Sequence, residues 1–316
     1  MTPEPPDPPT GTLTKSDVDP ALRRPLLPHS YHLDRGLRPQ RALMKLAGLA
    51  RRPQGVEVAT VNPYVTVRIH RPATLREDAP AMLWVHGGGY VVGTARLDEL
   101  FCRRLAHHVD AVVVAVEYRL APDYPYPVPL EDCYAALTWL ARQPWVDPSR
   151  IALGGASAGG GLAAALAILA RDRGEVAPVL QMLVYPMLDD RTGSRPDRLN
   201  GRLIWNGADN QRAWGWYLGD ADRSVAVPAR ATDLSGLAPA WLGAATLDLF
   251  YEENVAYGRA LHEAGTPCHL EVVERAYHGF DMAAPDAPVS IAFFASECRH
   301  LRAALGTERR AAAQAI

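Results

Sequence analysis

Two glycine-rich turns, each directly after a short apolar run, constrain the fold of this chain most strongly. His86-Gly87-Gly88-Gly89 follows the apolar run 81–85, and Gly155-Ala156-Ser157-Ala158-Gly159 follows the apolar run 151–153. Short apolar runs that end in glycine are typical of buried strands leading into tight turns. The Ala- and Leu-rich stretch after the second turn has the composition of a packed helix. We therefore expect a strand, a sharp turn and a helix around the second motif.

The same alternation of apolar runs and helical patterns continues along the chain. Strands are expected at 56–60, 65–69, 81–85, 112–117, 151–154, 179–185, 241–246 and 269–274. Helices are expected at 42–49, 97–108, 130–142, 158–172 and 252–264. Apolar strands that alternate with helices predict an α/β fold, with a mostly parallel sheet flanked by helices. Ligands of such folds bind at the carboxyl ends of the strands, where both glycine turns lie.

The rhythm breaks at the N-terminus and again between the strand at 179–185 and the strand at 241–246. Residues 1–14 form a Pro-rich tail that we expect to be disordered, and residues 15–52 suggest short helices. Residues 53–189 and 233–316 form the α/β domain, and residues 190–232 form an insertion rich in tryptophan. This insertion is either a lid over the site or a pair of surface helices anchored by their aromatic side chains.

Composition narrows the class of protein. Hydrophobic residues make up 48% and charged residues 22% of the 316 residues, with a formal net charge of −2. Such values are ordinary for globular proteins and give no electrostatic reason to expect a nucleic-acid partner. There is no signal-peptide pattern and no apolar run long enough to span a bilayer, so a cytoplasmic location is the default prediction.

The cysteines give no sign of a metal or dithiol site. Cys102, Cys133, Cys268 and Cys298 are widely separated and form no C-x-x-C spacing. This pattern argues against a zinc site or a redox dithiol, and we predict no metal. The thiols fit a reduced compartment, with one disulfide left open.

The two glycine turns carry chemistry when they are read together. The G-x-S-x-G pattern can expose Ser157 on a strained turn, and His-Gly-Gly-Gly can aim backbone amides at an oxyanion. The plain alternative for the serine motif is an incidental serine in a glycine-rich turn. A phosphate cradle is a poor interpretation of the first motif, because neither a P-loop nor a dinucleotide fingerprint is present. Acyl transfer is therefore the leading hypothesis.

A serine nucleophile needs a base, which needs a carboxylate to orient it. Among the histidines after Ser157, His278 follows a strand in a loop, which suits a mobile base. His262 and His300 fall in helical patterns and His269 falls in a strand.

Asp248 directly follows the apolar run 240–247, at the same expected edge of the sheet, and is the preferred carboxylate. Glu252 and Glu253 suit the start of the next helix, where negative charge is favourable. Asp189 and Asp190 also follow a strand but lie at the start of the insertion.

At this point the residues resemble the hormone-sensitive-lipase-like family of α/β-hydrolase carboxylesterases, over about residues 55–300. Besides the two glycine motifs, the matching segments are Tyr118-Arg119-Leu120-Ala121-Pro122, Pro125-Tyr126-Pro127, Leu130-Glu131-Asp132, Tyr185-Pro186, Leu237-Ala238-Pro239-Ala240-Trp241, Asp248 and His278-Gly279-Phe280. The resemblance implies the α/β-hydrolase fold with a helical cap built from residues 15–52 and 190–232. It also raises the expectation of a homodimer.

Carried onto matching positions, the resemblance implies a triad of Ser157, Asp248 and His278. It further implies an oxyanion hole formed by the N–H groups of Gly88, Gly89 and Ala158, while His86 shapes the loop around Gly87. No cofactor or metal is required, and the partner is a small-molecule ester. The aromatic side chains expected to set the depth of the substrate pocket are Tyr90, Tyr185, Trp205 and Trp214, and their bulk favours short or medium acyl chains.

The chain departs from the family pattern in two places. Ala156 stands before the nucleophile, where the family usually has Asp or Thr. The segment after Asp248 is Leu-Phe-Tyr-Glu-Glu rather than Pro-Leu-Arg-Asp-Glu, and we expect Glu252 to hold the His278 loop in place of the usual second acid. The motifs do not separate an esterase from an amidase, lactonase or formamidase. A non-catalytic binding protein on the same fold would be expected to lack a triad residue, and none is missing.

Overall fold

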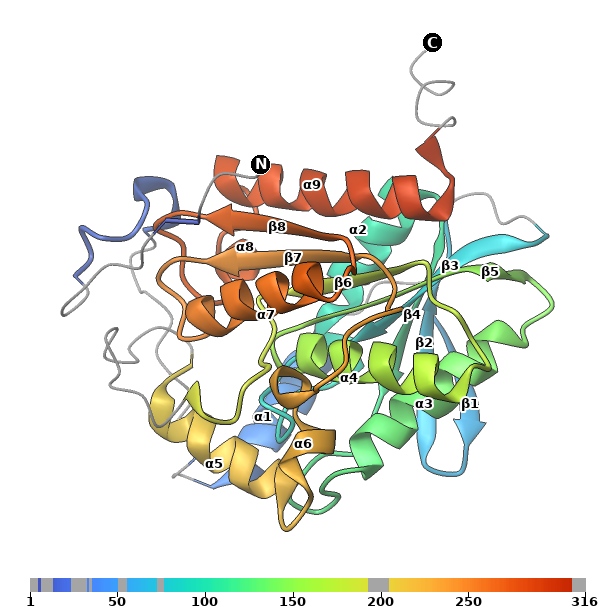
Figure 1. The fold of residues 1–316 in the computed structure, drawn as a ribbon, viewed down its shortest axis with the longest axis horizontal. Coiled ribbons are helices and arrows are strands. Elements are labelled where there is room, and N and C mark those ends of the chain that lie inside the picture. The colour runs from blue at the N-terminus through green and yellow to red at the C-terminus, as the bar shows by residue number, and fades with distance from the viewer. Residues whose placement is uncertain are drawn as a thin grey trace.

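The molecule is built on one eight-stranded sheet with helices on both faces (Figure 1). The computed structural model describes residues 5–6, 14–23, 33, 36–50, 56–72, 77–192 and 205–308. The strands follow one another across the sheet in the order β1-β2-β4-β3-β5-β6-β7-β8. Their bounds are β1 Glu57–Asn62, β2 Val65–His70, β3 Ala79–Val85, β4 Val112–Glu117, β5 Val146–Ala156, β6 Leu180–Val184, β7 Ala240–Ala245 and β8 Cys268–Val273.

The sheet is parallel from β4 through β8, and β2 alone runs in the opposite direction. The β1 strand pairs antiparallel with β2, and β2 pairs antiparallel with β4. The remaining neighbours pair in parallel, including β3 with β5. Parallel strands that leave the sheet at one edge bring their following loops together there. The loops after β3, β5, β7 and β8 carry the residues singled out from the sequence.

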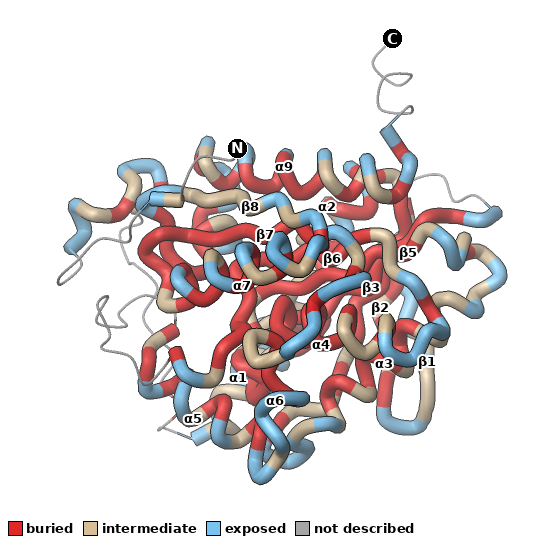
Figure 2. Tube along the Cα trace, viewed as in Figure 1, coloured by how far each residue is buried: buried red, intermediate tan, exposed pale blue. Residues whose placement is uncertain are grey.

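The helices divide between the two faces because side chains along each strand alternate. In β4, Val112, Val114 and Val116 join one buried core, while Val113 and Ala115 join another. The first core packs beneath α3 (Val128–Ala141) and α4 (Ala158–Arg173), and the second beneath α2 (Glu99–Val109), α8 (Phe280–Ala283) and α9 (Pro288–Leu305). The α7 helix (Tyr251–Glu263) covers β7 and β8 on the α4 side (Figure 1). Buried segments run through the middle of the molecule between these layers (Figure 2).

The predicted α/β fold is confirmed, and the predicted strands and helices lie within a few residues of those observed. The largest differences are of five residues: the helix predicted at 42–49 begins at Leu37, and β5 begins at Val146 rather than at residue 151. Asp147, Pro148 and Ser149 at its start are polar or turn-forming, so no apolar run marks this part of the strand.

Of the two segments expected to form a cap, residues 36–50 and residues 205–227 lie together on the α3 and α4 side of the sheet (Figure 1). Val18 and Leu22 of the first segment join the core on the opposite face. The first contains the short 3₁₀ helix η1 (Pro20–Leu22) and α1 (Leu37–Ala50). The second contains α5 (Gly207–Leu218), α6 (Arg223–Ala226) and the 3₁₀ helix η5 (Pro228–Arg230). Another 3₁₀ helix, η3 (Ala95–Asp98), precedes α2. Most of the Pro-rich tail at 1–14 falls outside the described residues, and its disorder stays a prediction, as does the division of the chain into domains.

Candidate active site

Ser157 occupies a strained turn between β5 and α4. Its backbone has φ 57° and ψ −124°, a conformation that residues other than glycine rarely adopt. The turn is fixed by its own main chain, because Ser157 N donates to Val184 O at 2.9 Å and Ser157 O accepts from Gly161 N at 3.0 Å. A Cβ at Gly155 or Gly159 would overlap neighbouring backbone, so the crowded turn requires glycine at both positions.

Three side chains from separate loops form one hydrogen-bonded row. His278 Nε2 lies 3.0 Å from Ser157 Oγ, and His278 Nδ1 lies 2.7 Å from Asp248 Oδ2. Asp248 follows β7 and His278 follows β8, so both side chains reach the edge of the sheet that Ser157 occupies. His278 and Asp248 are 6% and 3% exposed.

The partners of the imidazole define the protonation that suits catalysis. A carboxylate can only accept a hydrogen bond, so the proton of neutral His278 belongs on Nδ1. The lone pair on Nε2 then faces the Ser157 hydroxyl and can take its proton. The other oxygen of Asp248 accepts from Phe250 N at 3.0 Å, which fixes the carboxylate.

Two aromatic rings pack edge-on against the ring of His278. The Tyr185 ring lies edge-on at 4.8 Å between ring centroids, and the Phe250 ring lies edge-on at 5.2 Å. Tyr185 is itself anchored, because its hydroxyl donates to Asp281 Oδ1 at 2.8 Å. Desolvation raises the pKa of the Asp281 carboxyl, and the hydrogen bond from Tyr185 opposes that rise.

The glycine loop after β3 lies directly against the turn that carries Ser157. A Cβ placed on Gly87 would sit 3.0 Å from Ala156 O and 3.4 Å from Ser157 Cβ. Gly88 and Gly89 have φ values of 123° and 59°, which glycine adopts without strain. Ala158 begins α4, so its N–H belongs to a helix N-terminus, where partial positive charge favours an anion.

His86 faces the glycine loop rather than Ser157. Its Nδ1 donates to Gly87 O at 2.8 Å, and its ring stacks on Tyr118 at 4.3 Å. The Tyr118 hydroxyl donates to His86 O at 3.0 Å. These contacts fix the start of the loop.

Comparison with known proteins places the chain. Residues 82–282 match the family model of the α/β-hydrolase fold. Esterase LipI of Mycobacterium tuberculosis is 34% identical over 286 residues, which cover 84% of this chain and 88% of that protein. Ethyl acetate hydrolase of Pseudomonas putida is 34% identical over 235 residues, covering 68% of this chain and 70% of that protein. The solved structure of a bacterial heroin esterase superposes with a TM-score of 0.83 at 34% identity, covering 93% of this chain and 99% of that one.

The chain belongs to the hormone-sensitive-lipase-like family of α/β-hydrolase esterases. It is a carboxylic ester hydrolase. Within the described part of the chain, no helix has the length and apolar character to cross a membrane.

The four aromatic residues expected to line the substrate pocket of this esterase are all buried, and each lies near His278 or the glycine loop. Tyr90 stacks on Tyr217 and contacts Trp214, both from α5. Trp205 presses on Gly89, where an added Cβ would overlap its indole ring. Tyr185 contacts His278 as described above. Their role in setting the pocket stays a prediction.

The other candidate bases lie elsewhere in this esterase. His269 lies on β8, where its Nε2 contacts Glu271 of the same strand. Its ring packs against that of His300 on α9, with 4.3 Å between the ring centroids. His262 lies in the last turn of α7.

The acids at the start of α7 differ in burial. Glu252 is exposed, whereas Glu253 is 2% exposed and faces the interior. The role expected for Glu252 in holding the His278 loop stays a prediction. Asp189 and Asp190 form ion pairs with arginines, Arg191 and Arg230 respectively.

Three residues near the site are absent from the sequence-based candidates. They are Arg41, whose Nε donates to Val91 O at 2.8 Å, Asp281 beside Tyr185, and Asn254, whose side chain donates to Pro186 O at 2.7 Å. For a fourth residue, Glu253, the sequence predicts only a place in the first turn of a helix. Helical spacing could have revealed it, because Tyr257 and Leu261 follow at four-residue steps and mark the buried face of α7.

Among the described residues, no cluster of three or more histidine, cysteine or acidic side chains is arranged to hold a metal. All four cysteines are free thiols, so the disulfide left open by the sequence is not formed.

Proposed function

We propose that this esterase hydrolyses short- to medium-chain acyl esters through a Ser157–His278–Asp248 triad and an acyl-enzyme. The observation that carries the proposal is the hydrogen-bonded row of 2.7 Å and 3.0 Å contacts beside the glycine loop. His278 takes the proton of Ser157 as Oγ attacks the ester carbonyl, and Asp248 stabilises the imidazolium that forms. His278 then passes the proton to the leaving alcohol, and a water activated by the same imidazole releases the acid.

The N–H groups of Gly88, Gly89 and Ala158 are proposed to hold the oxyanion of the tetrahedral intermediate. Support comes from the left-handed glycine backbone, from the close approach of Gly87 to Ser157, and from the position of Ala158 at the start of α4. Donors fixed in advance stabilise developing charge without reorganisation, and losing one typically costs about 10²–10³ in turnover.

Bulky aromatic side chains support the preference for short or medium acyl chains. Ring atoms of Trp205 fill the space over Gly89, and Tyr90 packs against Trp214. The Pseudomonas putida relative is named for a two-carbon acyl ester, in agreement with this preference. The helical cap, formed by residues 15–52 and 190–232, is proposed to supply these walls.

Hydrolysis of p-nitrophenyl esters from acetate to laurate by the wild type and by Ser157→Ala tests the proposal. We expect the wild type to peak at short or medium chain length and the variant to lose hydrolysis of every ester. A fluorophosphonate probe should label the wild type on Ser157 and leave the folded variant unlabelled. Substantial activity or labelling of the variant would refute the triad, and a laurate optimum would refute the acyl preference.

A further inference from the structure

One short segment makes contacts with several parts of the proposed active site. We call residues Pro186–Thr192, which join β6 to the insertion, the strap. Met187 N in the strap donates to Ser157 O at 2.9 Å. Met187 O accepts from the Tyr90 hydroxyl at 2.8 Å. The strap therefore touches the backbone of the nucleophile and the tyrosine that follows the glycine loop.

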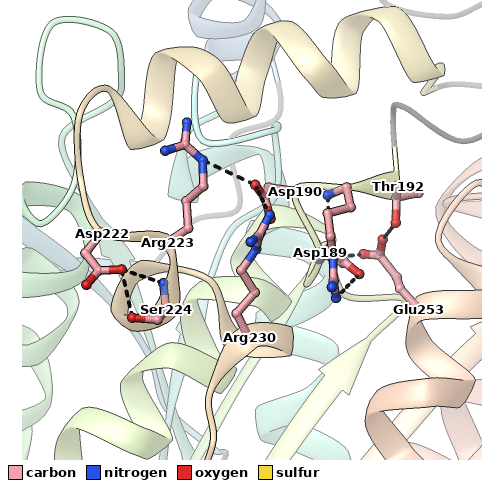
Figure 3. A network of polar contacts seen from close by, with 9 residues as sticks. Asp189, Asp190, Thr192, Asp222, Arg223, Ser224, Arg230 and Glu253 are labelled. Carbon is pink, nitrogen blue, oxygen red and sulfur yellow. Dashed lines mark hydrogen bonds and ion pairs between the residues drawn. The ribbon is translucent and has the colours of Figure 1, made fainter.

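The other side of the strap is fastened to α7 by two adjacent buried side chains. Asn254 Nδ2 donates to Pro186 O at 2.7 Å. Glu253 Oε1 accepts from Leu188 N at 2.6 Å and from Asp189 N at 3.3 Å. The Thr192 hydroxyl donates to the second oxygen of Glu253 (Figure 3).

Helix α7 also begins directly after the proposed triad carboxylate. Tyr251 N, at the start of the helix, donates to Asp248 O at 3.2 Å. Glu253 lies two residues farther along the same helix. The first turn of α7 thus connects Asp248 to the strap, and the strap connects α7 to Ser157.

A carboxyl group is a costly way to fill this space. Glu253 is 2% exposed, and burial raises the pKa of its carboxyl well above the usual range, while three hydrogen-bond donors oppose the rise. An apolar side chain would fill the volume without that desolvation cost but would leave the strap amides unpaired. The carboxyl of Glu253 is therefore needed to accept the hydrogen bonds that the strap donates.

The ends of the insertion are tied together by a separate pair. Asp190 accepts from Arg230 Nε at 2.6 Å and from Arg230 Nη2 at 2.9 Å (Figure 3). Arg223 Nε lies 3.5 Å from the same carboxylate. We call the ion pair of Asp190 and Arg230, which lie about forty positions apart, the neck. The neck does not involve Glu253, so Asp190 and Glu253 can be tested independently.

We propose that Glu253 is a positioning residue for the nucleophile, which acts through the strap to fix the main chain of Ser157. This inference rests on the proposed function, because it assigns the role of nucleophile to Ser157. The strap holds the carbonyl of Ser157, and a displacement there moves Oγ relative to His278. Misplacement of a reacting group by about 1 Å can cost about 10²-fold in rate.

Kinetics of Glu253→Ala, Glu253→Gln and the control Glu263→Ala, which changes an exposed glutamate at the end of the same helix, test the role. Glu253→Ala removes all three acceptor contacts and should lower kcat by up to about 10²-fold with little change in KM. The loss should be equal for p-nitrophenyl acetate and butyrate. Gln keeps an oxygen for the two amides and an N–H for Thr192 Oγ1, so Glu253→Gln should restore most of kcat. The control variant Glu263→Ala, at an exposed position of α7, should keep kcat at the wild-type level.

Three results would overturn the inference: wild-type kcat in Glu253→Ala, a loss that appears in KM, or a loss that grows with acyl length as a cap defect would. The neck variant Asp190→Asn provides the comparison for a cap defect. If Glu253→Ala does not fold, Thr192→Val decides, and it should lower kcat by a smaller factor without changing KM. An active Ser157→Ala would overturn the proposed function, whereas an inactive Ser157→Ala beside a fully active Glu253→Ala would overturn this inference alone.

Discussion

At the residue scale, four side chains constrain the imidazole of His278. Ser157 and Asp248 occupy its two nitrogens, and the edges of Tyr185 and Phe250 hold its plane. Tyr185 adopts a strained backbone conformation to make this contact, with φ at 34°. The bond from its hydroxyl to Asp281 keeps the ring in place and satisfies a desolvated carboxyl.

Tyr185→Phe tests the contribution of that hydroxyl. The variant keeps the ring against His278 but removes the hydroxyl that donates to Asp281, so the free energy of unfolding should fall by about 1–3 kcal/mol. Urea denaturation at neutral pH measures the change. Adding Asp281→Asn should restore part of the loss, because the amide costs less to desolvate than a carboxylate. An unchanged unfolding free energy in Tyr185→Phe would show that the bond does not stabilise the fold.

At the element scale, α5 and the glycine loop share an interface. Trp205, just before α5, covers Gly89, and Trp214 and Tyr217 of α5 pack on Tyr90. Helix α1 contributes Arg41, whose guanidinium donates to Val91 O at 2.8 Å and to Ala121 O at 2.5 Å. Both segments of the proposed cap therefore contact the loop that carries the proposed oxyanion donors.

Gly89→Ala, alone and with Trp205→Ala, tests this coupling. The added methyl overlaps the indole and occupies a backbone with φ at 59°, so the single variant should lose about 10²–10³ in kcat. Removing the indole opens the space but leaves the backbone strain, so the double variant should recover part of kcat. Steady-state kinetics with p-nitrophenyl butyrate measures both effects. A double variant as slow as, or slower than, Gly89→Ala would argue against the clash with Trp205.

Local sequence patterns predict the elements and the points where they end, because apolar runs, glycine stops and strand-helix alternation are properties of neighbouring residues. They also lead to Ser157, Asp248 and His278, since each follows a strand at one edge of a parallel sheet. Partners such as Asp281 for Tyr185, or the strap for Glu253, are separated by 96 and about 65 residues. No periodicity encodes such a pairing. Glu253 and its exposed neighbour are both acids, and only their placement on the helix distinguishes them.

At the scale of the whole molecule, the antiparallel side of the sheet contains a buried histidine outside the active site. His70 ends β2 opposite Val113 of β4 and is 3% exposed. Neither ring nitrogen has a hydrogen-bond partner among the residues that the structure describes. Burial, together with the positive charges of Arg68 and Arg103, lowers the pKa of His70 from 6.5 to about 4. The folded protein therefore holds this imidazole neutral in mildly acidic solution.

Because the pKa of His70 is lower in the folded than in the unfolded protein, the free energy of unfolding should decrease as the pH falls. The unfolded chain takes up the proton near pH 6.5 and the folded chain only near pH 4, so protons favour unfolding between these values. The contribution of His70 is fully present above pH 6.5 and declines by about 3 kcal/mol by pH 4. Urea titrations of the wild type and His70→Leu across this range should show a shallower decline for the variant. Parallel curves would mean that His70 does not titrate as buried.

The most direct test of the central claim is the kcat of Ser157→Ala, His278→Ala and the double variant on one ester. If the two side chains act as a unit, each single variant and the double variant should fall to the same level, a loss on the order of 10⁶. The account predicts this coincidence, with all three proteins folded. Losses that multiply in the double variant, or a single variant that retains most of its turnover, would contradict it.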